Sequence, residues 1–332
     1  MKHGIMGAVI IMQKLIIDES CDNQRIDKYL KKVLNRAPSS LIYKMLRKKD
    51  IKVNGKRVKE NYIVHTGDVV EMFLYDDKFA QYASPQTIYD LPVTFDVIYE
   101  DEHILIVNKP AGLLVHEDAH ESLNTLDHQV LNYLYQKGDY DPAIDRGFIP
   151  GPVHRLDRNT SGLVIFGKDL HALQDLNEMM KKRHCVEKTY LTIVKGRVQD
   201  AHLTGYVKKD SDEARVHFVK PDVAGAKYME TIVKAKEVNK ECSLVEVTLV
   251  TGRTHQIRIH MASVDHPVMG DSKYGDFNWN RQIKQRYHLN HQLLHAYKLM
   301  MTDPIGSMRY LKGKTFIAPL PEQFRKIKNS CF

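Results

Sequence analysis

The stretch from His154 to Phe166 places one carboxylate between two arginines at the start of an apolar segment. Asp157 stands between Arg155 and Arg158, and the following run to Phe166 is rich in β-branched residues, which predicts a buried strand. An aspartate held rigidly at the mouth of a core strand, and kept ionised by guanidinium neighbours, suits a nucleophile or a general base. Taken alone, the pattern favours the simpler alternative, a structural ion pair that fixes a loop.

A second group of polar side chains follows the strand expected at 244–250, in the segment Thr251 to Met261. His255 and His260, with His154 or His266, raise the question of a metal site. The two are five residues apart, which separates them by about 140° on a helix, and no acid is interleaved as in H-E-x-x-H. We therefore expect no metal.

Phosphate-loop and dinucleotide motifs are absent from the sequence. Gly313-Lys314-Thr315 has its upstream glycine, Gly306, seven residues before Gly313 where a phosphate loop requires five, and there is no G-x-G-x-x-G. We expect no cofactor.

The elements that must position these groups can be read from the apolar periodicity. Lys109 ends one strand within Asn108-Lys109-Pro110-Ala111-Gly112 and is expected to be solvated. Tyr190 lies in an alternating strand, where half-buried packing is the usual role. We expect strands over 95–99, 104–107, 188–194 and 244–250, and helices over 124–136 and from Asp169 to Lys181-Lys182-Arg183.

Positive charge is concentrated near the amino terminus. Residues 25–59 contain thirteen Lys or Arg and two acids, a net +11, whereas the whole chain carries +8. The rest of the protein is therefore net −3, and the basic segment favours a polyanionic partner.

This basic segment also has an ordered pattern. Ile26, Leu30, Val33 and Leu34 recur at helical spacing, and a second helix is expected over 41–48 with Ser39 or Ser40 as its N-cap. Asn54-Gly55 predicts a β-hairpin. The lysines and arginines gather on one face of a short α-α-β unit, as expected of a surface that binds phosphates with little sequence preference.

The remaining features limit the class of protein. Cys21, Cys185, Cys242 and Cys331 are far apart and fit a reducing cytoplasm. No apolar run reaches ~18 residues, so we expect no membrane span. Residues 1–23 are expected to be an extension, with Met1, Met6 or Met12 as the start, and residues 75–92 a linker without clear periodicity.

Several motifs together resemble a known family. HRLDRNTSG at 154–162, Asn-Lys-Pro-x-Gly at 108–112, Lys-x-Tyr at 188–190, Gly-Arg-x-His-Gln-x-Arg at 252–258, Gly-Asp-x-x-Tyr-Gly at 270–275 and Leu-Leu-His-Ala at 293–296 resemble the RluA-type (RluA, RluC and RluD) pseudouridine synthases. Val53-Asn54-Gly55-Lys56 and Gly67-Asp68 resemble the S4 RNA-binding domain. The resemblance implies an α+β fold: a small α-α-β S4 domain, then a catalytic domain on a mixed, largely antiparallel sheet.

The resemblance also implies roles for residues. Asp157 would act on the ribose, either as nucleophile at C1′ or as base at C2′; Tyr190 would stack on the base, and Arg258 would pair with Asp157. Arg155 would fill the space left by a flipped nucleotide or hold the neighbouring phosphate, Leu294 would form an apolar wall, and Asp271 is interpreted as a turn residue. We expect further RNA contacts from Arg253, His255, Lys44, Arg47, Lys48, Lys56 and Arg57.

The sequence thus predicts a cytoplasmic, monomeric isomerase that converts uridine to pseudouridine during RNA modification, without metal or dinucleotide. The expected domains are S4 at 24–74 and catalytic at 93–326. The family layout favours large-subunit ribosomal RNA and hence rRNA processing; transfer RNA, or both, is the alternative target. A non-catalytic S4-type RNA-binding adaptor and a hydrolase of N-glycosidic bonds are rival interpretations, although a hydrolase normally needs a second positioned carboxylate.

Overall fold

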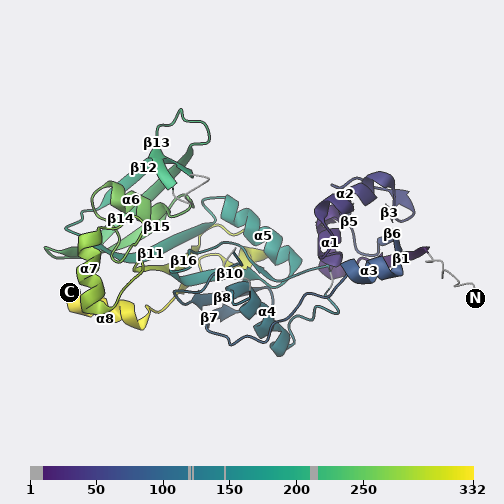
Figure 1. Ribbon diagram of the computed structural model, residues 1–332, viewed down its shortest axis with the longest axis horizontal. Helices are drawn as coiled ribbons and strands as arrows, with labels where there is room; N and C mark the ends of the chain where they lie inside the picture. The colour runs from purple at the N-terminus through teal and green to yellow at the C-terminus, as the bar shows by residue number, and fades with distance from the viewer. Residues whose placement is uncertain (1–9, 119–120, 122, 146, 210–215) are drawn as a thin grey trace, which may run out of the picture. The chain divides into compact units, whose positions relative to one another are not determined.

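A computed structural model describes residues 10–118, 121, 123–145, 147–209 and 216–332 of the chain. The chain divides into two compact units. The N-terminal unit comprises the residues up to Leu91 together with Val130–Gly151 and Lys168–His171, and the C-terminal unit comprises Pro92–Gln129, Pro152–Gly167 and Ala172–Phe332. Each unit has its own sheet and its own hydrophobic core (Figure 1).

The N-terminal unit packs short helices against a four-stranded sheet. Ile26 and Leu30 of one helix and Ile42 of the next are fully buried in its core, which confirms the expected apolar stripes. The elements are α1 (Ile26–Val33), α2 (Ser39–Lys48) and α3 (Asp76–Tyr82), the sheet β1 (Ile10–Ile16), β6 (Val69–Tyr75), β3 (Ile51–Val53) and β4 (Lys56–Arg57), and a separate pair β2 (Gln24–Arg25) and β5 (Ile63–Val64).

Three details of this unit differ from the sequence-based expectation. Residues 10–16, expected in an extension, form β1, which pairs antiparallel with β6 from Ile10 opposite Tyr75 to Ile16 opposite Val69. The segment expected as a linker contains α3, whose Phe79 and Tyr82 pack against the core. Helix α2 begins at Ser39 after Pro38 and has no side-chain cap, so the serine N-cap prediction is wrong. The first two depend on contacts distant in sequence, which local periodicity does not report.

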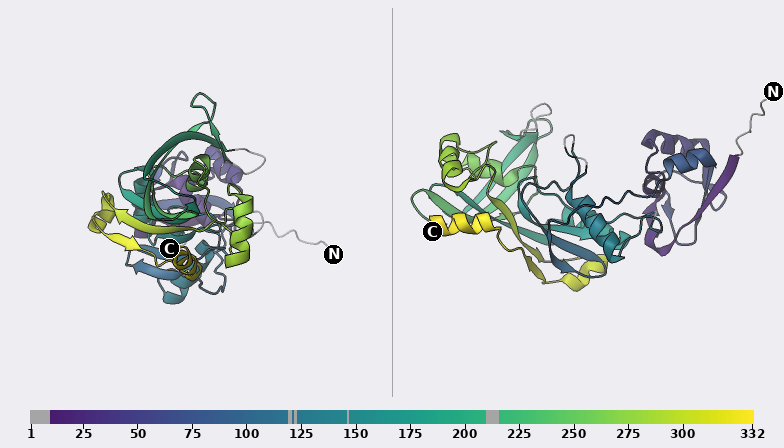
Figure 2. Two further views of the ribbon diagram at one scale, coloured as in Figure 1. Left: turned by 90° about the vertical axis from the view of Figure 1, so that its left-hand side faces the viewer. Right: turned by 60° about the horizontal axis from the view of Figure 1, so that its bottom comes forward.

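The C-terminal unit is built on an eleven-stranded sheet. Its main path runs β13-β12-β14-β15-β11-β16-β10-β8-β7, with β17 beside β16 and β9 beside β10. Neighbours along the main path are antiparallel except β10 and β16, which confirms the mixed, largely antiparallel sheet. The sheet is strongly twisted (Figure 2). The bounds are β7 Asp96–Glu100, β8 Ile104–Lys109, β9 Gly151–Pro152, β10 Ser161–Gly167, β11 Val186–Lys195, β12 Ala201–Lys209, β13 Val216–Val219, β14 Lys227–Val238, β15 Cys242–Leu249, β16 Leu294–Met301 and β17 Thr315–Ile317.

Strand β11 separates two environments because its side chains alternate between the faces of the sheet. Leu191 and Ile193 pack in one cluster with Phe324 and Ile327 of the last helix. Tyr190, which directly precedes Leu191, faces the other side. The helices are α4 (Leu126–Lys137), α5 (Leu170–Lys181), α6 (Gln256–Ser263), α7 (Phe277–Tyr287) and α8 (Glu322–Cys331), and 3₁₀ turns cover Glu19–Cys21 and Gly306–Leu311.

Candidate active site

The loop that carries Asp157 is anchored from below by Lys109. The side chain of Lys109 is fully buried, and its Nζ donates to the carbonyl oxygens of Pro110, Leu113 and Arg158 at 2.9, 2.7 and 3.0 Å. The backbone N–H of Gly112 donates to the same Arg158 carbonyl at 2.9 Å. The prediction of a solvated lysine is therefore wrong: the amine of Lys109 donates to three backbone carbonyls around the loop.

The other end of the loop enters β10 through a glycine that no other residue can replace without displacement. Gly162 has φ +112°, and a Cβ there would lie 2.2 Å from the carbonyl oxygen of Ala296 in β16. This close approach is where the parallel pair forms, with Ser161 opposite His295 and Gly162 opposite Ala296. The Asp157 loop is thus fixed against the middle of the sheet.

Asp157 is held by a buried arginine that also binds a second carboxylate. Arg258 of α6 donates from Nη1 to Oδ2 of Asp157 at 3.1 Å, and from Nε and Nη2 to Asp271 at 2.6 and 2.9 Å. Burial alone would raise the pKa of Asp271, but the hydrogen bonds and charge of Arg258, with backbone N–H donors from Tyr274 and Lys273, hold that pKa below its ordinary value. Arg258 therefore lies between two carboxylates.

His255 approaches Asp157 from the turn before α6. It adopts the left-handed conformation with φ +55°, its Nε2 lies 3.9 Å from Oδ2 of Asp157, and its Nδ1 is 2.9 Å from the hydroxyl of Tyr274. Burial lowers the pKa of His255, an effect that the negative charge of Asp157 opposes and the positive charge of Arg258 reinforces. A neutral imidazole beside Asp157 can donate or accept a hydrogen bond without adding a second positive charge to that of Arg258.

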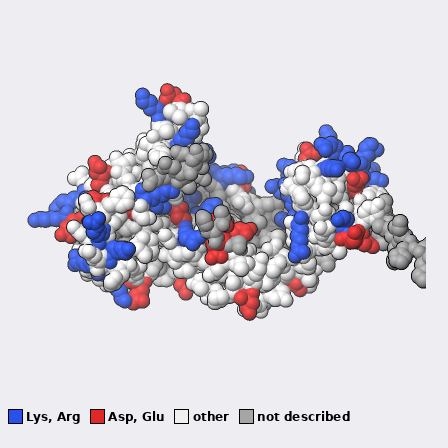
Figure 3. All heavy atoms as spheres, viewed as in Figure 1, with Lys and Arg blue, Asp and Glu red and all other residues white. Residues whose placement is uncertain are grey.

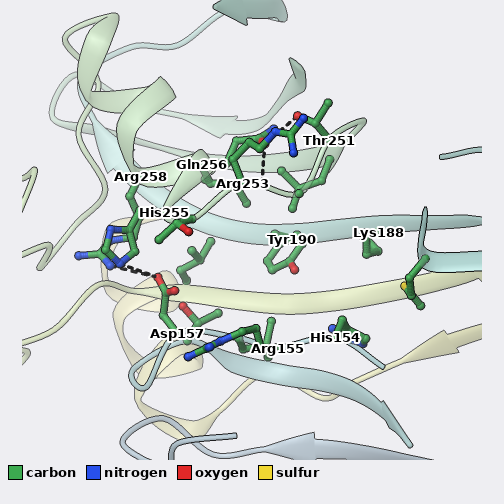
Figure 4. A pocket seen from close by; sticks show the side chains of 18 of the residues that line it. His154, Arg155, Asp157, Lys188, Tyr190, Thr251, Arg253, His255, Gln256 and Arg258 are labelled. Atoms are coloured by element: carbon green, nitrogen blue, oxygen red, sulfur yellow. Dashed lines mark hydrogen bonds and ion pairs between the residues drawn. The ribbon is translucent and has the colours of Figure 1, made fainter. Parts of the chain in front are cut away.

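Tyr190 presents its ring to the same pocket. Its side chain is 8% exposed, and burial, followed by the charge of Asp157, raises the pKa of its hydroxyl well above the ordinary value. Figure 4 shows the ring between Asp157 on one side and Lys188 with His154 on the other. A protonated, rigidly mounted aromatic ring is a stacking platform for a planar base.

The pocket has a volume of about 1060 Å³, and most of the charged residues that line it are cations. Its acids are Asp157 and Asp118, of which Asp118 pairs with Arg158 at 3.4 Å. Its cations are Arg155, Arg158, Lys181, Lys182, Arg183, Lys188, Arg253, Arg258 and Lys273. Such an excess of positive charge attracts a polyanion.

Most predicted site residues meet in this pocket. Arg155, exposed, and Leu294, buried, line it, as do Asp157, Tyr190, His255 and Arg258. Arg253 lines it too, while its Nε donates to the carbonyl of Tyr228 at 2.9 Å. The other predicted RNA contacts belong to the N-terminal unit, where they are exposed on α2 and β4 within a group of basic side chains (Figure 3): Lys44, Arg47, Lys48, Lys56 and Arg57.

Sequence reasoning missed four residues of this site. Asp271, interpreted as a turn residue, does accept from the Lys273 and Tyr274 backbone, but its main partner is Arg258. Its place in Gly-Asp-x-x-Tyr-Gly was the available signal, and the same motif contains Tyr274. Lys109 and Lys188 each stood within a quoted motif, but nothing in the sequence indicated the buried setting of Lys109 or the pocket position of Lys188.

Neither a metal site nor a membrane span emerges from the described part of the chain. Among residues 10–118, 121, 123–145, 147–209 and 216–332, no three His, Cys, Asp or Glu side chains form a group that would hold a metal ion. Within the same residues, no helix is both long enough and apolar enough to cross a membrane.

Comparisons with known proteins agree with the fold. The solved structure of human RNA pseudouridylate synthase domain containing 4 shares the fold, with a TM-score of 0.55 at 21% identity, over 69% of this chain and 90% of that one. The fold is thus that of the pseudouridine synthases. The RNA pseudouridylate synthase family matches residues 103–263, and the S4 domain matches residues 24–70.

Two relatives extend the match over most of the chain. An RNA pseudouridine synthase of Mycoplasma capricolum subsp. capricolum, named as uncharacterized, is 35% identical over 92% of this chain and 97% of its own. Ribosomal large subunit pseudouridine synthase C of Escherichia coli (strain K12) is 33% identical over 85% of this chain and 86% of its own. The chain belongs to the RNA pseudouridine synthase family, and it is an isomerase that acts on RNA.

Proposed function

We propose that this enzyme isomerises uridines of large-subunit ribosomal RNA in the cytoplasm, with Asp157 as the catalytic carboxylate. The observation that carries the proposal is the position of Asp157, which is hydrogen-bonded to Arg258 at 3.1 Å in a cationic pocket beside Tyr190. The target is taken from the relatives named as large-subunit synthases. All the proposed groups come from one chain, so a monomer suffices.

The reaction conserves every atom of the nucleotide. The C1′–N1 bond breaks, the base turns, and a C1′–C5 bond forms; C5 loses a proton and N1 gains one. A paired uridine must first leave the stack, at a cost of a few kcal/mol, and Arg155 occupies the space it leaves. Asp157 then either attacks C1′ or removes the proton from C2′, while Tyr190 stacks on the detached uracil.

The polar surroundings of Asp157 serve this chemistry in two ways. Arg258 stabilises the ionised form of Asp157, whose side chain is 30% exposed, and this pairing holds the charge when bound RNA displaces water, because a carboxylate removed from water needs a paired and hydrogen-bonded partner. With RNA bound over it, the pocket also keeps water from intercepting the separated sugar and base. Asp271 is unsuited to be the second carboxylate of a hydrolase, because it is fully buried and engaged by Arg258.

The N-terminal unit would hold the RNA without reading its sequence. Its exposed cations Lys44, Arg47, Lys48, Lys56 and Arg57 match the phosphate backbone in charge. We place the S4 domain at 24–74, extended by the paired strand β1 and by α3, with the rest of 75–92 as a linker and the catalytic domain at 93–326. Transfer RNA would offer the same phosphates, so the unit does not choose between the two targets.

The test uses unmodified large-subunit ribosomal RNA and transfer RNA transcripts with the wild-type enzyme and Asp157→Asn. The wild type should form pseudouridine in ribosomal RNA without change of mass, and Asp157→Asn should form none while binding RNA nearly as well. Activity in the Asp157→Asn variant would show that Asp157 is not the catalytic carboxylate. Modification confined to transfer RNA would show that transfer RNA, and not ribosomal RNA, is the target. Free uracil would indicate hydrolysis. A primary isotope effect from deuterium at C2′ would favour proton removal over attack at C1′.

A further inference from the structure

Lys188 lines the pocket but has no role in the chemistry described above. Lys188 lies two residues before Tyr190 on β11, so both side chains face the same side of the sheet, about 7 Å apart along the strand, and both line the pocket. Figure 4 shows Lys188 on the side of Tyr190 opposite Asp157. The pocket therefore continues past the base platform, away from the reacting carboxylate.

The ammonium of Lys188 has no counter-ion among the residues that the structure describes. It makes no hydrogen bond or ion pair with any residue in the described part of the chain, although its side chain is only partly exposed. Burial lowers the pKa of Lys188. A half-buried cation without a partner loses solvation and gains nothing in return, so a ligand anion at this point would recover the loss.

The neighbouring side chains do not supply that anion. Burial, followed by the positive charge of the nearby Lys188, lowers the pKa of the His154 imidazole to about 3. The Nε2 atom of His154 accepts a hydrogen bond from the backbone N–H of Ile165 at 3.2 Å. A neutral imidazole therefore faces the lysine. Of the two acids that line the pocket, Asp157 is hydrogen-bonded to Arg258 and Asp118 is paired with Arg158. The other charged residues of the lining are cations.

We propose that Lys188 binds a phosphodiester group of the substrate RNA, one nucleotide away from the flipped uridine. The proposal rests on the proposed function, because it assumes that the base of the target uridine lies on Tyr190. The two backbone positions are about 7 Å apart along the strand, so a base on Tyr190 brings the adjoining part of the RNA backbone to the part of the pocket that Lys188 lines. Lys188 thus fixes the direction in which the RNA backbone leaves the active site.

The first test compares Lys188→Met with Lys188→Arg and a matched control, Lys298→Met. Lys298 lies opposite Thr189 on β16, so its partly exposed side chain lies on the other face of the sheet. Under single turnover on large-subunit ribosomal RNA transcript, Lys188→Met should raise the half-saturating enzyme concentration on the order of tenfold and reduce the salt slope by about 0.7. Lys188→Arg and Lys298→Met should behave as the wild type.

A second test locates the phosphate. Stem-loops containing the mapped uridine would each carry one neutral methylphosphonate, on a 2′-O-methyl nucleotide, at successive positions around it. One substitution should weaken the wild type and have no further effect on Lys188→Met. Additive effects at every position, an unchanged salt slope, or a loss confined to the limiting rate would each overturn the proposal. Failure of the wild type to form pseudouridine in any RNA would instead overturn the proposed function.

Discussion

Arg258 donates two hydrogen bonds to Asp271, from Nε to Oδ2 at 2.6 Å and from Nη2 to Oδ1 at 2.9 Å. This fork fixes the plane of the guanidinium and leaves Nη1 for the loop carboxylate. Asp271 thus orients the donor that meets Asp157, without facing the pocket itself.

Replacing Asp271 by Asn should therefore damage both folding and turnover. Removing the buried charge of Asp271 leaves Arg258 paired only with the partly exposed Asp157, and the loss of one partner of a buried ion pair costs up to about 3 kcal/mol. Denaturant unfolding should show that loss, and the turnover of Asp271→Asn should fall with it. The double variant Arg258→Met with Asp271→Met should recover part of the stability while staying inactive. Wild-type stability in Asp271→Asn would contradict the assigned pairing.

Substitutions at Tyr190 should distinguish the contribution of its ring from that of its hydroxyl. Because the ring supplies the stacking surface, Tyr190→Leu should lose about 1–3 kcal/mol of substrate binding, measured as a raised half-saturating concentration, while Tyr190→Phe should keep the wild-type value. A Tyr190→Phe variant that bound normally but turned over slowly would assign the hydroxyl to the proton that leaves C5.

The free energy of unfolding should fall as the pH drops from about 6.5 to about 4. Burial lowers the pKa of His260 and of His295 to about 4, whereas the unfolded chain binds a proton at its ordinary value of about 6.5. Between these values the unfolded state holds more protons, so stability rises with pH across this window. His260→Gln should flatten the slope by at most about 1.4 kcal/mol per pH unit, and the exposed His171→Gln should not.

Charge reversal on α2 should weaken RNA binding without touching the chemistry. Arg47→Glu with Lys48→Glu removes two exposed cations, so affinity should fall and the salt slope should become shallower, whereas the single-turnover rate at saturating RNA should stay near the wild-type value. Reversal of the exposed Lys234 and Lys240 of the C-terminal unit is the matched control. Equal losses in both variants would show a general charge effect and no specific role for α2.

The elements that local periodicity defines were predictable from the sequence, and those that distant contacts define were not. The apolar spacing of Ile26 to Leu34 and the run Leu163 to Phe166 gave a helix and a buried strand in the right places. By contrast, the pairing of Ile10 with Tyr75 joins segments far apart in the chain, and no local pattern reports it.

The site shows the same division. Asp157 and Arg258 were predicted because their motifs resembled a known family. The burial of Lys109 was missed because its three acceptors, the carbonyls of Pro110, Leu113 and Arg158, are backbone groups that no residue pattern reveals. Lys188 was missed for a related reason. A lysine in a strand normally reaches water, and only the three-dimensional surroundings of Lys188 reveal that no acidic side chain among the described residues pairs with it.

The parallel contact between Gly162 and Ala296 also bears on how the enzyme is made. Ser161 bonds to His295 across 134 residues of chain, so the strand that supports the catalytic loop leaves the ribosome long after the loop itself. The S4 sheet, by contrast, is complete once Tyr75 has emerged. A growing chain can therefore form the basic surface of its N-terminal sheet before the pocket around Asp157 is assembled.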